Sequence, residues 1–107
     1  MNTIPQMPDM ERARREHLRW LIILTLNNAR PIGAAERLIL SVAHADYPDA
    51  TLTELRRELD YLDERELVDI TKTPDGRWSA KLTRYGVDVA EYTIDCEPGI
   101  ARPAKYW

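Results

Sequence analysis

The sequence has little cysteine and no long apolar run, and each absence excludes a class of protein. Cys96 is the single cysteine, so no disulfide can form within the chain, and a lone thiol is typical of a reducing, cytoplasmic compartment. The longest apolar run, 20–24, is far shorter than the roughly 20 residues that a membrane helix needs. We therefore expect a cytoplasmic protein with no membrane segment.

An excess of positive charge is also absent. Fifteen Lys and Arg stand against eighteen Asp and Glu, which gives a net charge of -3. No overall positive field attracts the chain to nucleic acid, so DNA binding would need a local basic patch.

Patterns of catalytic or metal-binding residues are missing as well. His17 and His44 are the only histidines, and neither belongs to a nucleophile or zinc motif. The four glycines form no phosphate-binding loop, and Cys96 beside Glu97 lacks the positive neighbours that make a thiol reactive. We expect no enzyme activity, no metal and no cofactor.

What the sequence does contain is helical periodicity within a length, 107 residues, typical of one small domain. A first helix is predicted over 11–29, capped by Asp9, and a second over 34–45. A third begins at Thr51, where Thr-Leu-Thr-Glu has the form of a capping box, and extends to residue 66. Its leucines at 52, 55, 59 and 62 form one apolar stripe.

The pattern then changes to the alternation of strands. Segments 67–72 and 77–82 alternate on either side of Pro-Asp-Gly, which predicts a β-hairpin. Thr83 can cap a short final helix. The predicted organisation is a flexible leader (1–9), one domain (10–92) and an irregular C-terminal tail (93–107).

The predicted order is helix, helix, helix, strand, strand, helix, a mainly α fold with a small β-hairpin (α+β). Three segments, 61–68 (YLDERELV), 76–78 (GRW) and 82–86 (LTRYG), carry a family resemblance. The chain resembles small winged-helix regulators over roughly residues 15–90. Its tail, with PGIARP at 98–103, is similar to small uncharacterised proteins of Mu-like phages and prophages, which implies a bacterial host cell.

The winged-helix resemblance implies a transcriptional regulator with its third helix in the major groove of double-stranded DNA and its hairpin wing on phosphates. The candidate groove residues are Thr53, Arg56, Arg57 and Tyr61, and the candidate wing residues are Lys72, Arg77 and Lys81. The charge is divided, since residues 51–66 sum to -3 whereas residues 69–84 sum to +2. Phosphate repels an acidic helix, so a winged-helix module that binds a protein partner instead of DNA remains an alternative.

Several of these residues also have an ordinary structural interpretation. Arg56 could pair with Asp60, and Arg57 with Glu54 or Asp60, on the surface of the helix. Trp78 could pin its strand onto the helices rather than stack on a ligand. The arginines that open the first helix, at positions 12, 14, 15 and 19, are a solvated helix start or, less often, a DNA-binding arm.

The first helix is apolar on two opposite sides. Trp20, Ile23 and Leu24 lie opposite a face formed by Leu18, Ile22 and Leu26. We expect a second subunit to cover the face with Trp20, giving a homodimer. The alternative is that the C-terminal tail, with Tyr106 and Trp107, covers it within one chain.

Overall fold

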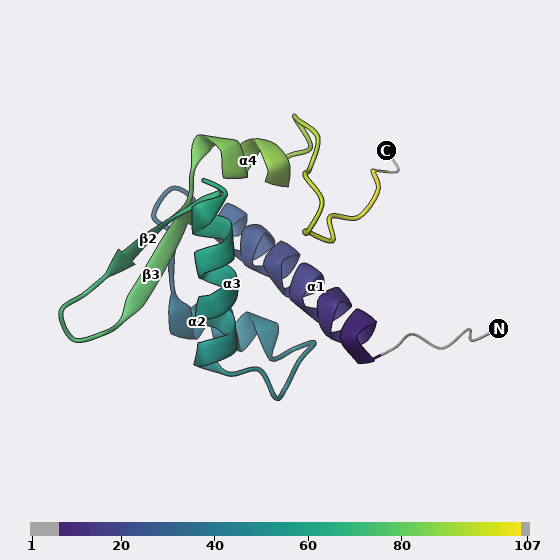
Figure 1. The fold of residues 1–107 in the computed structure, drawn as a ribbon. Coiled ribbons are helices and arrows are strands. Elements are labelled where there is room, and N and C mark those ends of the chain that lie inside the picture. The colour runs from purple at the N-terminus through teal and green to yellow at the C-terminus, as the bar shows by residue number, and fades with distance from the viewer. Residues whose placement is uncertain (1–6, 106–107) are drawn as a thin grey trace.

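The structure is a computed structural model that describes residues 7–105, shown in Figure 1. The elements in chain order are α1 (Met7–Asn28), β1 (Ala34–Ala35), α2 (Glu36–Ala43), α3 (Leu52–Glu64), β2 (Val68–Lys72), β3 (Trp78–Leu82) and α4 (Arg84–Ala90). The predicted order is confirmed, with one addition, the short strand β1.

The sheet is antiparallel and its strands lie in the order β1-β3-β2. Ala80 in the middle of β3 pairs with Ala34 on one side and Ile70 on the other. The hairpin of β2 and β3, which we call the wing, projects away from the helices (Figure 1). Gly76 closes its turn with a φ of +85°, a conformation that favours glycine.

Two helix starts follow the predicted capping chemistry. The Thr51 hydroxyl accepts the N–H of Glu54 at 3.2 Å, and the Thr83 hydroxyl accepts the N–H of Gly86 at 3.0 Å. The second hydrogen bond that a capping box implies, from the Thr51 N–H to the Glu54 carboxylate, is not the one formed. The Glu54 carboxylate instead accepts hydrogen bonds from Arg14 of α1. The start of α3 is thereby tied to α1.

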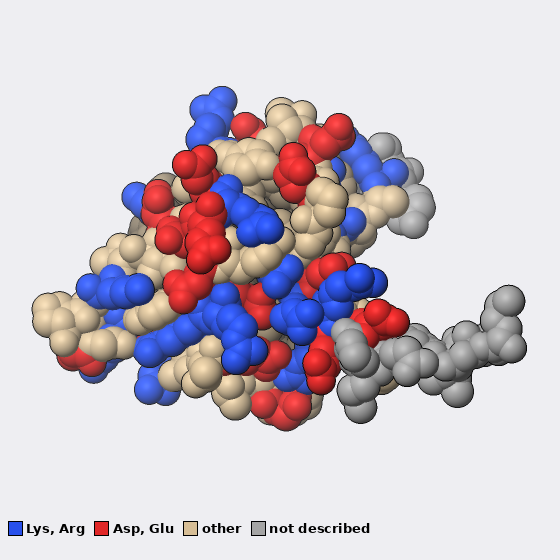
Figure 2. All heavy atoms as spheres, in the orientation of Figure 1, with Lys and Arg blue, Asp and Glu red and all other residues tan. Residues whose placement is uncertain are grey.

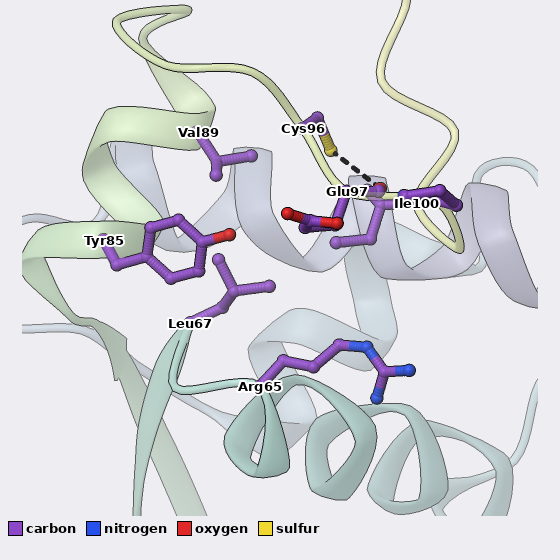
Figure 3. Close-up of a pocket in the computed structure, with 8 residues that line it drawn as sticks. Arg65, Leu67, Tyr85, Val89, Cys96, Glu97 and Ile100 are labelled. Carbon is purple, nitrogen blue, oxygen red and sulfur yellow. Dashed lines mark hydrogen bonds between the residues drawn. The ribbon is translucent and has the colours of Figure 1, made fainter.

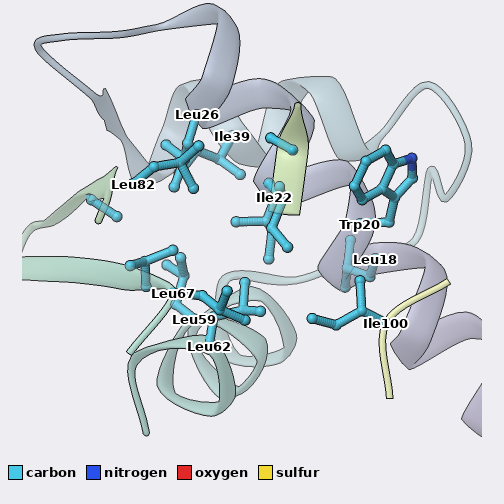
Figure 4. Close-up of a cluster of buried hydrophobic side chains, with 14 of the residues drawn as sticks. Leu18, Trp20, Ile22, Leu26, Ile39, Leu59, Leu62, Leu67, Leu82 and Ile100 are labelled. Atoms are coloured by element: carbon cyan, nitrogen blue, oxygen red, sulfur yellow. The ribbon is translucent and has the colours of Figure 1, made fainter. Parts of the chain in front are cut away.

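The core lies where α1, α3 and the sheet meet (Figure 4). Leu55, Leu59 and Leu62 of the predicted stripe are almost completely buried. They pack in one cluster with Leu18 and Ile22 of α1. Burial of apolar surface stabilises a fold by about 25 cal/mol per Å², so the buried leucine stripe is a main source of stability for α3.

Two predicted boundaries are wrong. Helix α1 begins at Met7, so Asp9 lies in its first turn and does not cap it, although an acidic side chain there still suits the helix dipole. The predicted second helix is shorter, because Ala34 and Ala35 pair with β3 before α2 starts at Glu36. The leader prediction falls largely on residues 1–6, which lie outside the described residues.

The C-terminal segment 91–105 has no helix or strand, as predicted for the tail, and folds back along α1 (Figure 1). Arg19 donates to the Gly99 carbonyl at 2.8 Å, and the Ala101 N–H donates to the Glu16 carbonyl at 3.1 Å. Between these two contacts Ile100 enters the core. The segment is therefore an integral part of the domain.

The same folding back changes the interpretation of the second apolar face of α1. Trp20 is 4% exposed and Ile23 is fully buried within one chain, while Leu24 is half-buried. The Trp20 ring meets Tyr92 edge-on, with ring centres 6.1 Å apart. The prediction that a second subunit covers Trp20 and Ile23 is wrong, because the chain buries both itself. Tyr106 and Trp107, the alternative cover, lie outside the described residues.

Four helices and a three-stranded antiparallel sheet, two strands of which form the projecting wing, make a winged helix, a mixed α+β fold. Among residues 7–105, no helix combines the length and the apolar character that crossing a membrane requires.

Candidate nucleic-acid interface

The outward face of α3 is basic only where the helix begins. Thr53 and Arg57 are both exposed on this face. Arg57 makes no ion pair within residues 7–105, so neither of the predicted pairings, with Glu54 or with Asp60, is formed. The start of α3 thus presents one free guanidinium and one hydroxyl.

Arg56 has a different role from its neighbour. Its Nε and Nη2 atoms donate to the two carboxylate oxygens of Glu36 at 2.6 and 2.8 Å. Nη2 also donates to the Gly76 carbonyl at the turn of the wing, at 2.8 Å. The predicted pairing with Asp60 is wrong, because Arg56 points across to α2 and the wing.

The contact between α2, α3 and the wing, which we call the junction, is centred on Glu36. The sequence analysis did not identify Glu36 as a functional residue. Its side chain is almost completely buried and also accepts the N–H of Trp78 in β3, at 3.0 Å. The hydrogen bonds from Arg56 lower the pKa of Glu36, and burial opposes them. One carboxylate therefore fixes the start of α2, the start of α3 and the wing relative to one another.

Trp78 continues the junction into the wing. The Arg56 guanidinium lies 4.8 Å from the centre of the Trp78 ring, and the Lys72 ammonium lies 4.2 Å from it. The ring is half-buried against the core, as predicted for a residue that pins its strand. Lys72 is thereby placed on the side of the sheet that meets α3.

The other two predicted wing residues are not equivalent. Arg77 is 79% exposed and pairs with Asp75 at 3.1 Å near the tip. Lys81 lies between Ala80 and Leu82, which point into the core, so it points to the opposite side of the sheet. There it lines a hollow with Arg30 and Pro31, away from α3. The structure therefore separates Lys81 from the other predicted DNA contacts.

The acidic residues on the α1 side of α3 are paired within the domain. Arg14 holds Glu54 through two hydrogen bonds of 2.8 and 2.9 Å, and these bonds raise the pKa of Arg14. Arg19 holds the buried Glu58 at 2.7 Å. The net charge of -3 predicted for the helix region thus overstates the charge that its first half presents to a partner.

Arg15 of α1 is a basic residue that sequence reasoning set aside. It lines two shallow hollows between α1 and α3, and Arg57 lines the same two hollows. We call Arg15, Arg57, Arg56, Lys72 and Arg77 the basic band. Figure 2 shows basic side chains gathered across the start of α3 and acidic ones gathered over its end.

Tyr61, the last of the residues predicted to lie in the DNA groove, makes its contacts within the domain. Its ring lies under the guanidinium groups of Arg19 and Arg65, at 3.4 and 3.8 Å from the ring centre. Its hydroxyl lies beside Gly99, where an added Cβ would overlap with it. Tyr61 therefore packs toward the C-terminal segment rather than toward the wing.

The histidines and the cysteine offer no catalytic arrangement. His17 contacts the Tyr47 hydroxyl at 2.7 Å, and His44 contacts the Ala50 carbonyl at 2.9 Å. Burial raises the pKa of the Cys96 thiol, which keeps it protonated at neutral pH. Within residues 7–105, no three His, Cys, Asp or Glu side chains gather in a way that could hold a metal ion.

Comparison with solved structures agrees with the fold. The chain is similar to a candidate DNA-binding protein of Ralstonia eutropha, with 24% identity and a TM-score of 0.61, covering 73% of this chain and 95% of that one. It is also similar to F-93 of SSV1, with 14% identity and a TM-score of 0.55, covering 71% and 80% of the two chains. No protein-family model and no curated protein matches the sequence. At these identities the likeness establishes the winged-helix fold.

Proposed function

We propose that this protein binds double-stranded DNA through the basic band and acts as a transcriptional regulator of the phage or prophage type. The start of α3 enters the major groove, and the wing lies along the phosphate backbone. The name of the Ralstonia protein, which refers to DNA binding, agrees with this proposal.

The observation that carries the proposal is the division of charge along α3. Glu54 and Glu58 are paired with Arg14 and Arg19, so the first half of the helix presents Arg57 without a competing carboxylate partner. Lys72 and Arg77 are exposed on the wing and add two cations to this surface. Lys and Arg contacts to phosphate supply much of the affinity of DNA-binding proteins.

Each residue of the band then has a distinct task. Arg57 and Thr53 are placed to reach base edges, and an arginine can bind guanine through two hydrogen bonds. Lys72, Arg77 and Arg15 contact phosphates. Arg56 positions the wing, since its donors already bind Glu36 and the Gly76 carbonyl.

The acidic end of α3 restricts how the helix can approach DNA. Asp60, Asp63 and Glu64 are exposed on its second half. Phosphate would repel them, so the helix enters the groove with its first two turns only. We also propose a homodimer, which would have to form through a surface other than Trp20 and Ile23.

The test compares charge reversals on the two sides of the wing. Lys72→Glu and Lys81→Glu make the same change in one hairpin, but only Lys72 lies on the side of α3. Binding to a fluorescent random-sequence duplex at low salt is measured by anisotropy. We expect Lys72→Glu to weaken binding about tenfold and Lys81→Glu to change it by about twofold or less.

A second pair of variants tests α3 itself. Arg57→Glu should weaken binding about tenfold or more, because it removes a contact and adds a repulsion. Arg84→Glu is the matched control, since Arg84 is 91% exposed on α4. Equal effects of Arg57→Glu and Arg84→Glu would contradict the assignment of α3 as the DNA-binding helix.

A second candidate function is a protein-interaction module without DNA binding. The exposed carboxylates at the end of α3 favour it, because they form a surface suited to a basic partner. In that case no duplex binds at low salt, and the Lys72 and Arg57 variants have no DNA affinity to lose.

A further inference from the structure

A cavity of about 360 Å³ opens beyond the end of α3, between the α3–β2 connection, α4 and the C-terminal segment (Figure 3). None of its lining residues belongs to the basic band. Its size is in the range of cavities that hold small organic molecules.

The inner surface of the cavity is apolar and fixed. Leu67, Val89 and Ile100 line it and are 2%, 1% and 9% exposed. All three belong to the core cluster, so their positions are set by the packing of the domain.

The segment that forms the third wall is held on both sides of the cavity. Arg102 donates to the Val89 and Ile94 carbonyls at 3.0 and 2.9 Å, and Arg19 donates to the Gly99 carbonyl. Hydrogen bonds within the chain therefore hold this wall in place, which lowers the entropy cost of binding.

Besides Cys96 and Pro98, three polar side chains line the rest of the cavity. In Figure 3 the Tyr85 hydroxyl and the Glu97 carboxylate point toward one another, and the Arg65 side chain lies on another side. Arg65 and Glu97 carry opposite charges and are both exposed at the rim, yet no ion pair joins them within residues 7–105. The Arg65 guanidinium is instead held over the Tyr61 ring.

The cysteine in the wall does not suggest covalent chemistry. The Cys96 thiol donates to the Glu97 carbonyl at 3.5 Å, and burial raises its pKa. A neutral thiol is a weak nucleophile, so Cys96 gives the cavity no reactive thiolate.

We propose that the cavity binds a small zwitterion with an apolar body, such as a free amino acid with a large aliphatic or aromatic side chain. The ligand's ammonium group binds the Glu97 carboxylate and the Tyr85 oxygen, and its carboxylate binds Arg65. Its side chain covers Leu67, Val89 and Ile100. A ligand with only a positive charge would be repelled by Arg65, and one with only a negative charge would be repelled by Glu97. The two residues together therefore favour a zwitterion.

The first test compares matched ligands on the full chain. L-Phenylalanine, phenethylamine and 3-phenylpropionate all contain a phenyl group. Phenylalanine carries both charges, phenethylamine only the positive charge and 3-phenylpropionate only the negative charge. Calorimetry gives the affinities, and the methyl NMR signals of Leu67, Val89 and Ile100 report the place of binding. We expect phenylalanine to move these signals and to bind about tenfold more tightly than either analogue. Failure of phenylalanine to bind, or an analogue that binds equally well, would overturn the proposal.

Variants of the rim distinguish this site from adventitious binding. Glu97→Gln keeps the shape of the side chain and should weaken phenylalanine binding about tenfold. Glu91→Gln is the matched control, because Glu91 is exposed at the end of α4 and does not line the cavity. Both glutamates are exposed, so neither change should unfold the protein. Equal affinities of the two variants would contradict the role of Glu97. The proposal does not depend on DNA binding, and failure of either one leaves the other intact.

Discussion

Arg56 and Glu36 form a two-contact ion pair that joins α3 to the start of α2, with distances of 2.6 and 2.8 Å. The same carboxylate accepts the Trp78 N–H of the wing, and the same guanidinium donates to the Gly76 carbonyl at its tip. One pair of residues therefore adds a polar tie between the wing and α3 to the packing of Ala80 and Leu82 in the core, and the proposed DNA interface depends on this arrangement.

Substitution of Glu36 should destabilise the domain. Glu36→Ala leaves the Trp78 N–H without its acceptor and Arg56 without its counter-charge, and the side chain it removes is buried. We expect the free energy of unfolding to fall by about 2 kcal/mol or more in urea denaturation. Glu64→Ala, at an exposed position of α3, is the control and should change it by about 0.5 kcal/mol or less. A Glu36→Ala effect as small as that of the control would show that the pair does not hold the junction.

The same carboxylate should make stability depend on pH. Its pKa in the folded state lies below its ordinary value of 4.5, chiefly because Arg56 donates hydrogen bonds to the ionised form. The stabilisation is therefore complete above the ordinary value and is lost as the pH falls through the lower, folded value. Wild-type protein should lose stability more steeply than Glu36→Gln as the pH falls below the ordinary glutamate pKa of 4.5. Denaturation curves at a series of pH values check this, and parallel pH profiles for the two proteins would contradict it.

The sequence predicted the elements whose signals are local. The leucine stripe of α3, the caps at Thr51 and Thr83, and the Pro-Asp-Gly turn are each determined by residues close together in the chain, and each is confirmed. The strand β1 was missed, because its two alanines have no strand preference and are ordered only by pairing with β3.

The candidate site was harder to predict because its charges pair over long distances in sequence. Arg14 reaches Glu54, and Arg56 reaches back to Glu36 in a different helix. One signal was available, since four arginines at the start of α1 and an excess of acids in α3 are complementary charges. The individual arginine–carboxylate pairs could not be predicted, because they depend on how the helices pack.

Gly99 should tolerate no side chain. It has a φ of +105°, and a Cβ there would overlap with the Tyr61 hydroxyl. Gly99→Ala should lower the free energy of unfolding by about 1–3 kcal/mol. In a Tyr61→Phe background the overlapping oxygen is gone and the next ring carbon lies 3.3 Å away, so the cost of Gly99→Ala should be smaller. A double-mutant cycle in urea measures this coupling, and strictly additive effects would contradict the contact.

Trp20 should contribute to the stability of the single chain. Because Trp20 is buried against Tyr92 within one chain, Trp20→Ala should cost about 3 kcal/mol or more in unfolding free energy. If the cost arises inside one chain, it stays constant over about a hundredfold range of protein concentration. A cost that grows with protein concentration would instead place Trp20 between two subunits.

The most direct test of the proposed function is the salt dependence of binding to a random-sequence duplex. The basic band offers five cations, of which Arg56 is engaged within the domain and Arg57 is assigned to base edges, so about three phosphate contacts are expected. The logarithm of the binding constant should then fall with the logarithm of salt concentration with a slope of about -3. Absence of binding at low salt, or binding that does not change with salt, would contradict the account.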